Sequence, residues 1–407
     1  MISFEEALTR VTDAAAPLGA ETVPLASAAG RVLAETLVAD LDLPPFATTA
    51  MDGWAVKAAT VASAPARFRV AGTLGAGSPA GALPDGFALK VMTGAPLPEG
   101  SDAVVPVEEA REEGDGTVSL LAVPKPGAHV RRRGEVITAG DTFLPPGRRL
   151  SPADLVLAAA AGREALRVVR RTRAGVIVTG DEVVPSGTRP GPAQIRNTNG
   201  PLLFSALSRF GADAVDLGTV SDDRRALRAT LGSALAARLD LLLTTGGVSA
   251  GDFDLVPEVL EELGAVPSFH KVAIKPGKPV YFAVVGETLV FGLPGNPVSA
   301  AVVFDLLVRP ALRKSAGLSP AFPPTVEATL LGPAANGGPR LFFQPARLTR
   351  EGTNLLAAPI PTKGSHDVVA HAMAGGLLVL PSGTRLSAGD GVSVLLGTDE
   401  TTLGSSA

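Results

Sequence analysis

The stretch that decides the fold is Ala174-Gly175-Val176-Ile177-Val178-Thr179-Gly180-Asp181-Glu182, an apolar run that ends in a polar turn containing glycine. Similar apolar runs occur at 214–217, 239–243 and 289–293, and each is followed by a polar turn. Helical patterns lie between or after these runs, at 200–210, 224–238, 255–263 and 298–314. Alternating helices and apolar strands predict a mostly parallel sheet that is covered on both faces, with all four runs buried.

Outside this α/β segment, the sequence changes to short apolar runs broken by Gly and Pro. Such runs fill about 40–147, for example at 68–72 and 103–107, and they return after Pro320 at 325–330 and 376–380. This texture is typical of β structure with many tight turns. The sequence therefore predicts a β-rich lobe before the α/β domain and a small β domain after it.

Two helices are expected near the first lobe. Ser3 and Glu6 have the spacing of a capping box, and apolar residues follow it at helical spacing from Phe4. Pro152 stands at the first position of a second expected helix. We therefore predict a multi-domain α/β plus β protein in three parts. They are an N-terminal region at 1–168, an α/β domain at 169–318 and a C-terminal β domain at 319–400.

Composition excludes several classes of protein. Of 407 residues, 46% are apolar and 19% are charged, which is too apolar for a disordered chain. The net charge is 36 − 40 = −4 without a long basic block, so no nucleic-acid partner is expected. No apolar run is long enough for a membrane span, and the acidic start is unlike a secretion signal. The absence of cysteine excludes thiolate chemistry and fits a cytoplasmic protein. With four histidines, any metal site should use oxygen ligands.

The turns after the four expected strands carry the polar side chains of interest. Because ligands bind beyond the carboxyl ends of parallel strands, these turns should share one site. Six carboxylates would meet there: Asp181, Glu182, Asp222, Asp223, Asp252 and Asp254. Like charges repel, so the six need a cation or separate helix caps. A magnesium ion bound together with phosphate is one interpretation, and Asp222 or Asp223 as a plain N-cap is the other.

Two further segments favour anion binding. Gly246-Gly247-Val248-Ser249 follows an apolar strand and can approach phosphate closely, or can simply form a tight strand–helix connection. Ile274-Lys275-Pro276-Gly277-Lys278-Pro279 is a stiff loop with two ammonium groups, which suits phosphate unless the loop is a solvated turn. No nucleophile–base motif and no Walker A loop occurs. We therefore expect chemistry by anion and metal binding.

The N-terminal lobe contains three motifs whose functional and ordinary interpretations both stay open. Asp52-Gly53 and Thr93-Gly94 have the composition of ordinary turns, and 131–135 (Arg-Arg-Arg-Gly-Glu) can bind phosphate or face solvent.

Seven segments, taken in their order along the chain, resemble the molybdopterin molybdenumtransferases, meaning the MoeA type and the E domain of gephyrin. They are 50–53, 92–96, 131–135, 179–182, 246–249, 274–279 and 292–300.

The resemblance implies a fold, an activity and a set of site residues. The protein would be a homodimer of multi-lobed subunits, each with a molybdopterin-binding α/β domain. The N-terminal lobe of the other subunit would complete each site. The reaction would be adenylylated molybdopterin plus molybdate giving molybdenum cofactor and AMP, with Mg²⁺. Asp52, Glu182, Asp222 and Asp254 would be catalytic, and the last three would hold the metal. Substrate would contact Thr93, Gly246, Gly247, Ser249, Lys275, Lys278, Pro294 and Pro297. Other cofactor-biosynthesis proteins and acceptor apo-enzymes would be further partners.

The chain departs from the family pattern at several positions. Ala47, Val136 and Asn197 each stand where an acid is usual, and Trp54 replaces a common tyrosine. Val136 matters most because it cannot act as a carboxylate, although Glu135 or Asp141 could compensate. Two alternatives therefore stay open: a molybdopterin-binding carrier without catalysis, and a nucleotide pyrophosphatase. Preference for molybdate over tungstate is not decided by the sequence.

Overall fold

The computed structural model describes residues 1–248, 255–323, 325–397 and 404–405. The chain forms two compact units, one made of residues 1–21, 30–34 and 167–407 and the other of 22–29 and 35–166. The strands β1 (Ala20–Pro24) and β12 (Ala165–Val169) carry the chain from one unit to the other. The first expected helix thus belongs to the same unit as the α/β domain, and the division at 168 and 318 stays a prediction. Among the described residues, no helix has the length and apolar character needed to cross a bilayer.

The smaller unit contains the predicted β-rich lobe. Its main sheet has the strand order β7 (Ala103–Pro106), β4 (Gly53–Val56), β6 (Phe87–Val91), β5 (Ala66–Leu74), β9 (Thr117–Leu120), β8 (Ala110–Glu112). Trp54 and Phe68 are buried in its core with neighbouring valines. Its other elements are η1 (Leu25–Ser27), β2 (Leu37–Val38), β3 (Thr48–Thr49), η2 (Ala58–Thr60), η3 (Val107–Glu109), β10 (Val130–Arg131), β11 (Thr142–Leu144) and α2 (Pro152–Ala160).

The larger unit is built on the predicted mostly parallel sheet. The strand order is β16 (Asp213–Val220), β13 (Arg173–Thr179), β17 (Leu241–Thr245), β21 (Thr288–Leu293), β20 (Tyr281–Val285), β18 (Val266–His270). The first four strands are parallel, and β20 runs antiparallel to both of its neighbours. The fold class is therefore confirmed, whereas the hairpin strands β18 and β20 were not expected from the sequence.

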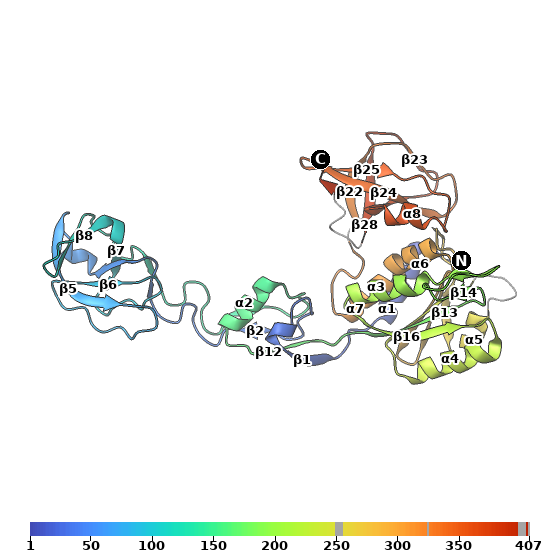
Figure 1. Cartoon of the computed structure of the whole chain (residues 1–407), viewed down its shortest axis with the longest axis horizontal. Coiled ribbons are helices and arrows are strands. Elements are labelled where there is room, and N and C mark those ends of the chain that lie inside the picture. Colours follow the sequence, from blue (N-terminus) through green and yellow to red (C-terminus); the bar gives the residue numbers. More distant parts are fainter. Residues whose placement is uncertain (249–254, 324, 398–403, 406–407) are drawn as a thin grey trace. The chain divides into compact units, whose positions relative to one another are not determined.

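Helices cover both faces of this sheet. Figure 1 shows α1 (Phe4–Ala14), α3 (Asn199–Arg209), α6 (Pro297–Val303) and α7 (Arg309–Ser315) on one side, and α4 (Arg224–Ala236) and α5 (Val256–Glu262) on the other. Two separate apolar clusters fill the two interfaces. The predicted two-sided cover is thus confirmed, because the buried side chains of β13, β17 and β21 alternate between the clusters.

Three details differ from the expectation. The strand β16 is not buried, because it forms the edge of the sheet, and Val215 is 37% exposed. The helix expected over 298–314 is interrupted by a π-helical turn, η4 (Phe304–Val308). Pro310 has no N–H to donate along the helix, so the hydrogen-bond ladder changes before it. At α1, Ser3 accepts from the amide of Glu6 as expected, but the Glu6 carboxylate pairs with Arg10.

The C-terminal β domain is a small barrel. β24 (Leu341–Glu351), β25 (Asn354–Pro359), β22 (Thr325–Leu330), β28 (Gly391–Leu396) and β26 (Gly376–Leu380) pair in that order, and β26 pairs back to β24. The short strand β19 (Ile274–Lys275) joins β24 from the loop that precedes β20. The remaining elements of the larger unit are β14 (Val183–Val184) and β15 (Ile195–Arg196), which lie between β13 and α3, and β23 (Ala334–Ala335), α8 (Val368–Ala372), β27 (Arg385–Leu386) and β29 (Gly404–Ser405), which follow β22 along the chain.

Candidate functional site

The carboxyl ends of the four parallel strands lie side by side at one edge of the sheet. Thr179 at the end of β13 is in register with Val220 at the end of β16. Thr245 at the end of β17 is in register with Val178 and with Leu293. The turns after these strands therefore come together, as the sequence predicts.

The loop 274–279, which carries Lys275 and Lys278 and is named the lysine loop, starts at the same edge because of a strand pairing that the sequence did not reveal. Since β20 is antiparallel to both β21 and β18, the strand β18 runs in the same direction as β21. Residues that follow His270 at the end of β18 therefore emerge beside the turns of the parallel strands. The segment 271–280 reaches the site through this antiparallel hairpin.

A cavity of about 1150 Å³ opens along this edge. Eight of the predicted site residues line it: Glu182, Asp222, Gly246, Gly247, Lys275, Lys278, Pro294 and Pro297. Ser249 and Asp254 lie outside the described residues. Asp52 and Thr93 belong to the other compact unit. The structure thus gathers the predicted residues of the α/β domain around one cavity, and their roles there stay predictions.

The glycine turn after β17 is sterically required. Gly246 has φ +93°, and a Cβ on it would lie 2.6 Å from Oγ1 of Thr179. The amide of Gly246 donates to the carbonyl of Leu293, so this N–H is already used within the protein. A tight strand–helix connection therefore explains Gly246 structurally, and its role in holding phosphate stays a prediction.

Buried hydrogen bonds hold three of the turns together. The Nδ2 of Asn199, at the start of α3, donates to Oγ1 of Thr245 at 2.5 Å and to the carbonyl of Gly295 at 2.8 Å. The Thr245 hydroxyl donates in turn to the carbonyl of Pro294. These hydrogen bonds join the three turns at the cavity, whereas Oδ1 of Asn199 is buried without a hydrogen-bond partner among the described residues.

The carboxylates at this edge have different surroundings. Asp223 is the N-cap of α4 and accepts from the amide of Ala226 at 2.8 Å, which confirms the plain capping interpretation for this residue. The Glu182 carboxylate folds over Gly180, where an added Cβ would lie 2.5 Å from Oε2. Glu182 and Asp222 line the cavity. Among the described residues, no group of three or more Asp, Glu or His side chains is gathered as a metal site.

The lysine loop is fixed by packing on both sides. Gly277 has φ +101°, and a Cβ there would lie 2.6 Å from Cγ2 of Val303. The Arg340 guanidinium donates to the carbonyl of Ile274 at 2.9 Å. The Lys275 ammonium lies 4.6 Å from the centre of the Phe342 ring, in cation–π geometry. The backbone of the loop is thus held in place while the two lysine side chains stay exposed.

Sequence reasoning missed several polar residues that line the cavity. They are Arg196, Asn199, Asn296, Ser299, Arg340, Ser365 and His366. Ser365 accepts from Nδ2 of Asn296, so the C-terminal domain is joined to the start of α6. Ser299 and Asn296 lay within a recognised motif and could have been named. Nothing local in the sequence connects Arg340 or Ser365, which belong to the barrel, with a site in the α/β domain.

In the smaller unit, Asp52 and Thr93 contact each other directly. Thr93 donates both its amide, at 2.7 Å, and its hydroxyl, at 2.8 Å, to Oδ1 of Asp52. The hydrogen bond from the amide, followed by that from the hydroxyl, lowers the pKa of Asp52. The adjacent Gly53 is required for packing, because a Cβ would lie 2.3 Å from the carbonyl oxygen of Val105. The two predicted residues of this lobe therefore form one polar unit.

The residues that depart from the family pattern have different surroundings. Val136 is 63% exposed. The Glu135 carboxylate accepts from the amide of Arg132 and the Asp141 carboxylate from the amide of Thr138, so each caps its own turn. Asn197 lines the cavity and its Oδ1 accepts from the amide of Gly200 at 2.9 Å. The amide oxygen of Asn197 thus makes a bond that a carboxylate could also make.

Comparison with known proteins gives one consistent family along the chain. Three family models match in order: MoeA N-terminal region (domain I and II) at 2–162, probable molybdopterin binding domain at 175–314, and MoeA C-terminal region (domain IV) at 327–396.

Curated relatives and solved structures agree with these models. A molybdopterin molybdenumtransferase from Bacillus subtilis (strain 168) is 35% identical over 97% of this chain and 94% of its own length. One from Synechococcus elongatus is 39% identical over 73% of this chain and 75% of its own length. A crystal structure of a molybdopterin biosynthesis MoeA protein from Pyrococcus horikoshii is 33% identical, with a TM-score of 0.82 over 97% of this chain and 99% of that one. The chain belongs to the molybdopterin molybdenumtransferase family.

Proposed function

We propose that the protein is a transferase of molybdenum cofactor biosynthesis that inserts molybdenum from molybdate into adenylylated molybdopterin and releases AMP. One observation carries this proposal. A large cavity at the carboxyl edge of the central sheet brings together two lysines, two carboxylates and a glycine turn from separate parts of the chain. Such a set suits a ligand that contains a diphosphate.

The cations of the cavity would hold the anionic groups of the substrates. Lys275 and Lys278 are exposed side chains on a loop whose backbone is fixed, so anion binding would order their side chains without having to order the loop. Arg340 reaches the same cavity and braces this loop. Together these groups would neutralise the diphosphate and the molybdate oxyanion, which are both substrates of the reaction.

Magnesium fits the donor set of this cavity. Mg²⁺ usually takes one or two carboxylates and fills its other positions with water and substrate phosphate oxygens. Glu182 and Asp222 would supply the carboxylates, and Asp254 stays a predicted third ligand. When bound, the ion would offset the charge of the diphosphate. We expect Glu182→Gln to raise the Mg²⁺ concentration needed for half-maximal AMP release, with Asp216→Asn as a control that does not line the cavity.

The decisive experiment is incubation of the purified protein with adenylylated molybdopterin, Mg²⁺ and molybdate, with AMP measured over time. AMP release that requires molybdate supports the transferase. Release without molybdate, or from ordinary dinucleotides, would point to a pyrophosphatase. Binding of the pterin without AMP release would point to a carrier. Repeating the assay with tungstate measures the oxyanion preference.

Val136 can be tested in the same assay. If the missing acid limits turnover, Val136→Asp should raise the rate of AMP release or lower the molybdate requirement. The exposure of Val136 makes this change tolerable for the fold. An unchanged rate and unchanged requirements would show that the acid is dispensable in this chain.

We also propose that the protein acts as a homodimer in the cytoplasm. Asp52 and Thr93 belong to one compact unit and the cavity residues to the other. A C₂ dimer in which Asp52 of the partner subunit completes the site would bring both sets to one ligand. Mixing an Asp52→Ala variant with an Asp254→Ala variant should then restore part of the activity. A fully active monomer in sedimentation would contradict the dimer.

The further partners of the protein would be cofactor-biosynthesis proteins that supply the substrate and apo-enzymes that accept the product.

A further inference from the structure

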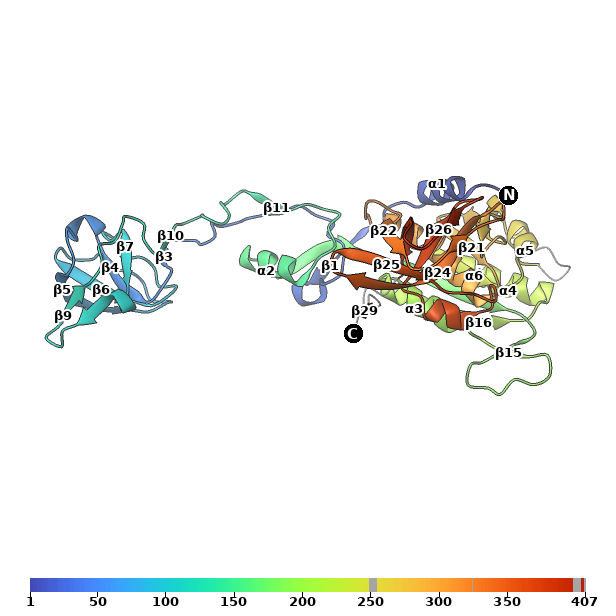
Figure 2. The same cartoon turned by 90° about the horizontal axis from the view of Figure 1, so that it is seen from above.

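One wall of the cavity is formed by a segment that the proposed function has not used. We name residues 183–197, from β14 to β15, the strap; Figure 2 shows it as the long green loop beside the label β15. Six of its residues line the cavity: Val183, Pro190, Gln194, Ile195, Arg196 and Asn197.

Hydrogen bonds at both ends and inside the strap hold its shape. Ile195 donates its amide to the carbonyl of Glu182 at 2.8 Å, and Asn197 donates to the carbonyl of Val184 at 2.7 Å. Within the strap, the amide of Gly191 donates to Oε1 of Gln194 at 3.0 Å. The strap therefore presents a defined surface to the cavity.

Arg196 is oriented by this framework. Its Nε donates to the carbonyl of Thr188 across the strap at 3.0 Å. Within the described part of the chain, its two terminal nitrogens have no ion pair or hydrogen bond. A guanidinium that is anchored at Nε offers its terminal N–H groups in a fixed fork, which matches two oxygens of a phosphate.

The strap also offers apolar surface to the cavity. Ile195 is 56% exposed although it lines the cavity, and Val183 and Pro190 line the same wall. An apolar wall next to an arginine suits a flat heteroaromatic ring, because the ring can pack on aliphatic carbon and on the guanidinium plane. Phosphate and ring binding are thus available on one short segment.

The position of the strap relative to the lysine loop separates two halves of the substrate. The strap follows β13, whereas the lysine loop follows β18, and β17, β21 and β20 lie between them in the sheet. Hydroxyls and cations gather toward the lysine loop, where Ser299, Arg340 and Ser365 line the cavity. Molybdate must meet the pterin sulfurs, so the oxyanion and the pterin belong on that side. The cavity wall formed by the strap is then the part of the site available to the nucleotide.

We propose that the strap is the nucleotide-binding half of the site, with Arg196 on the phosphate of the adenylate and with Ile195, Val183 and Pro190 against its base. This assignment rests on the proposed function, because it takes the substrate to be an adenylylated pterin. It gives the missed residue Arg196 a role distinct from that of the lysines, which would hold the pterin-side phosphate of the diphosphate and the molybdate.

The test is AMP binding, measured by calorimetry in the presence of Mg²⁺. Arg196→Ala should weaken AMP binding about 10- to 100-fold, the range of a lost hydrogen-bonded charge pair. Arg196→Lys should recover only part of the affinity, since it keeps the charge without the fork. Arg189→Ala is the matched control, because Arg189 is an exposed arginine of the same strap that does not line the cavity. It should bind AMP as the unchanged protein does.

A second pair of probes separates the ring from the phosphate. Ile195→Ser should weaken AMP but leave ribose 5-phosphate binding unchanged, whereas Arg196→Ala should weaken both. Equal AMP affinity in the Arg196→Ala and Arg189→Ala variants would overturn the proposal. So would an unchanged protein that binds no AMP, or an Arg196→Ala variant that loses molybdopterin instead of AMP. Molybdate-dependent AMP release by the unchanged protein tests the proposed function separately.

Discussion

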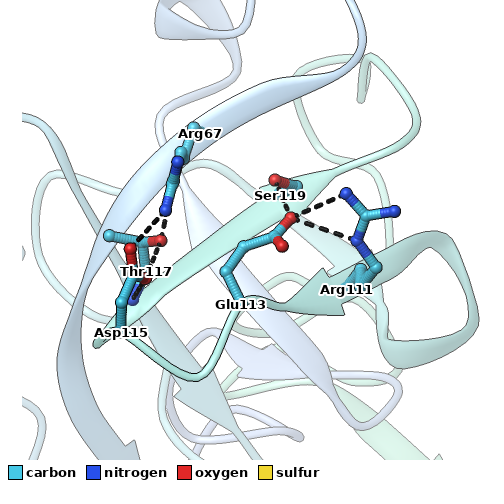
Figure 3. A network of polar contacts seen from close by, with 6 residues as sticks. All are labelled: Arg67, Arg111, Glu113, Asp115, Thr117 and Ser119. Atoms are coloured by element: carbon cyan, nitrogen blue, oxygen red, sulfur yellow. Dashed lines mark hydrogen bonds and ion pairs between the residues drawn. The ribbon is translucent and has the colours of Figure 1, made fainter.

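Charged side chains serve two different purposes in the two compact units. On the sheet of the smaller unit, Figure 3 shows carboxylates that already have hydrogen-bond partners: Ser119 and Arg111 donate to Glu113, while Thr117 and Arg67 donate to Asp115. At the cavity, no ion pair joins Lys275, Lys278 or Arg196 to an acid among the residues that the structure describes. The hydrogen bond from the Ser119 hydroxyl, followed by that from Arg111, lowers the pKa of Glu113. The hydrogen bond from the Thr117 hydroxyl, followed by the charge of Arg67, lowers the pKa of Asp115. These contacts brace a hairpin. Charges held in place without a partner are available to a ligand.

The difference shows where binding energy can come from. A charge that already has a partner in the free protein must give it up to bind a ligand, which cancels most of the gain. A lysine on a braced loop gives up only water, and Lys275 in addition gives up its cation–π contact with Phe342. Removing charges should therefore affect stability in the smaller unit and affinity at the cavity, and the following variants test that contrast.

The largest effect is expected from the lysine loop. Replacing Lys275 and Lys278 together with Ala removes two charge-assisted contacts to the diphosphate, each worth roughly 1.5–3 kcal/mol. Affinity for adenylylated molybdopterin should fall about 100-fold or more, while the melting temperature stays nearly constant because both side chains are exposed. Equal affinity in a folded double variant would return the loop to the solvated-turn interpretation.

The glycine turn should respond in stability as well as in activity. Gly246→Ala forces a Cβ against Thr179 at φ +93°, which should cost about 1–3 kcal/mol of unfolding free energy and disturb the cavity. Gly337→Ala is the control, since an added Cβ there meets no atom within 4 Å. Urea titration of both variants measures the difference. A Gly246→Ala protein as stable as the control would mean that the turn relaxes easily.

Asp305 differs from both the paired charges and the cavity charges, because its carboxylate has a distant partner, Arg309, and lines no proposed ligand site. Burial raises the pKa of Asp305 to about 6, against the attraction of Arg309 at 3.8 Å. Because the folded pKa lies above the unfolded value, ionisation destabilises the fold as pH rises from about 4 through 6. Asp305→Asn should therefore stabilise the protein by about 1–3 kcal/mol at pH 8 and by almost nothing at pH 4.

Unfolding by urea at the two pH values checks this sign. The exposed Asp85 provides the matched control, and Asp85→Asn is unfolded at the same two pH values for comparison. Loss of stability in Asp305→Asn at pH 8 would show that the pair with Arg309 outweighs the cost of burial.

The smallest effect is expected in the paired network of the smaller unit. Glu113→Gln weakens the bonds from Arg111 and Ser119 at an exposed site, so the melting temperature should fall only slightly. Ligand affinity should not change. A marked loss of affinity in this variant would break the proposed separation between bracing charges and binding charges.

Much of the architecture could be predicted because local patterns reflect local physics. The apolar runs of β13, β17 and β21 reveal buried strands, and the polar turns after them meet because parallel strands end at one edge. Asp223 as an N-cap and Ser3 as a cap acceptor likewise follow from neighbours a few residues away. The hairpin of β18 and β20 was missed, and the exposure of β16 was misjudged, because a strand's partners are not encoded in the strand itself.

By itself, the sequence determined the order of motifs and the residues that could bind an anion, while its three-part division of the chain stays a prediction. Only the tertiary structure decided which of these residues meet, because the meeting depends on strand direction and on contacts between distant segments. Arg340 and Ser365 reach the cavity through the pairing of β19 with β24 and through the bond of Asn296 to Ser365. Arg196 faces the cavity because a carbonyl eight residues earlier holds its guanidinium. A sequence pattern records side-chain chemistry and local spacing, whereas a site requires positions in space that long-range hydrogen bonds and packing define.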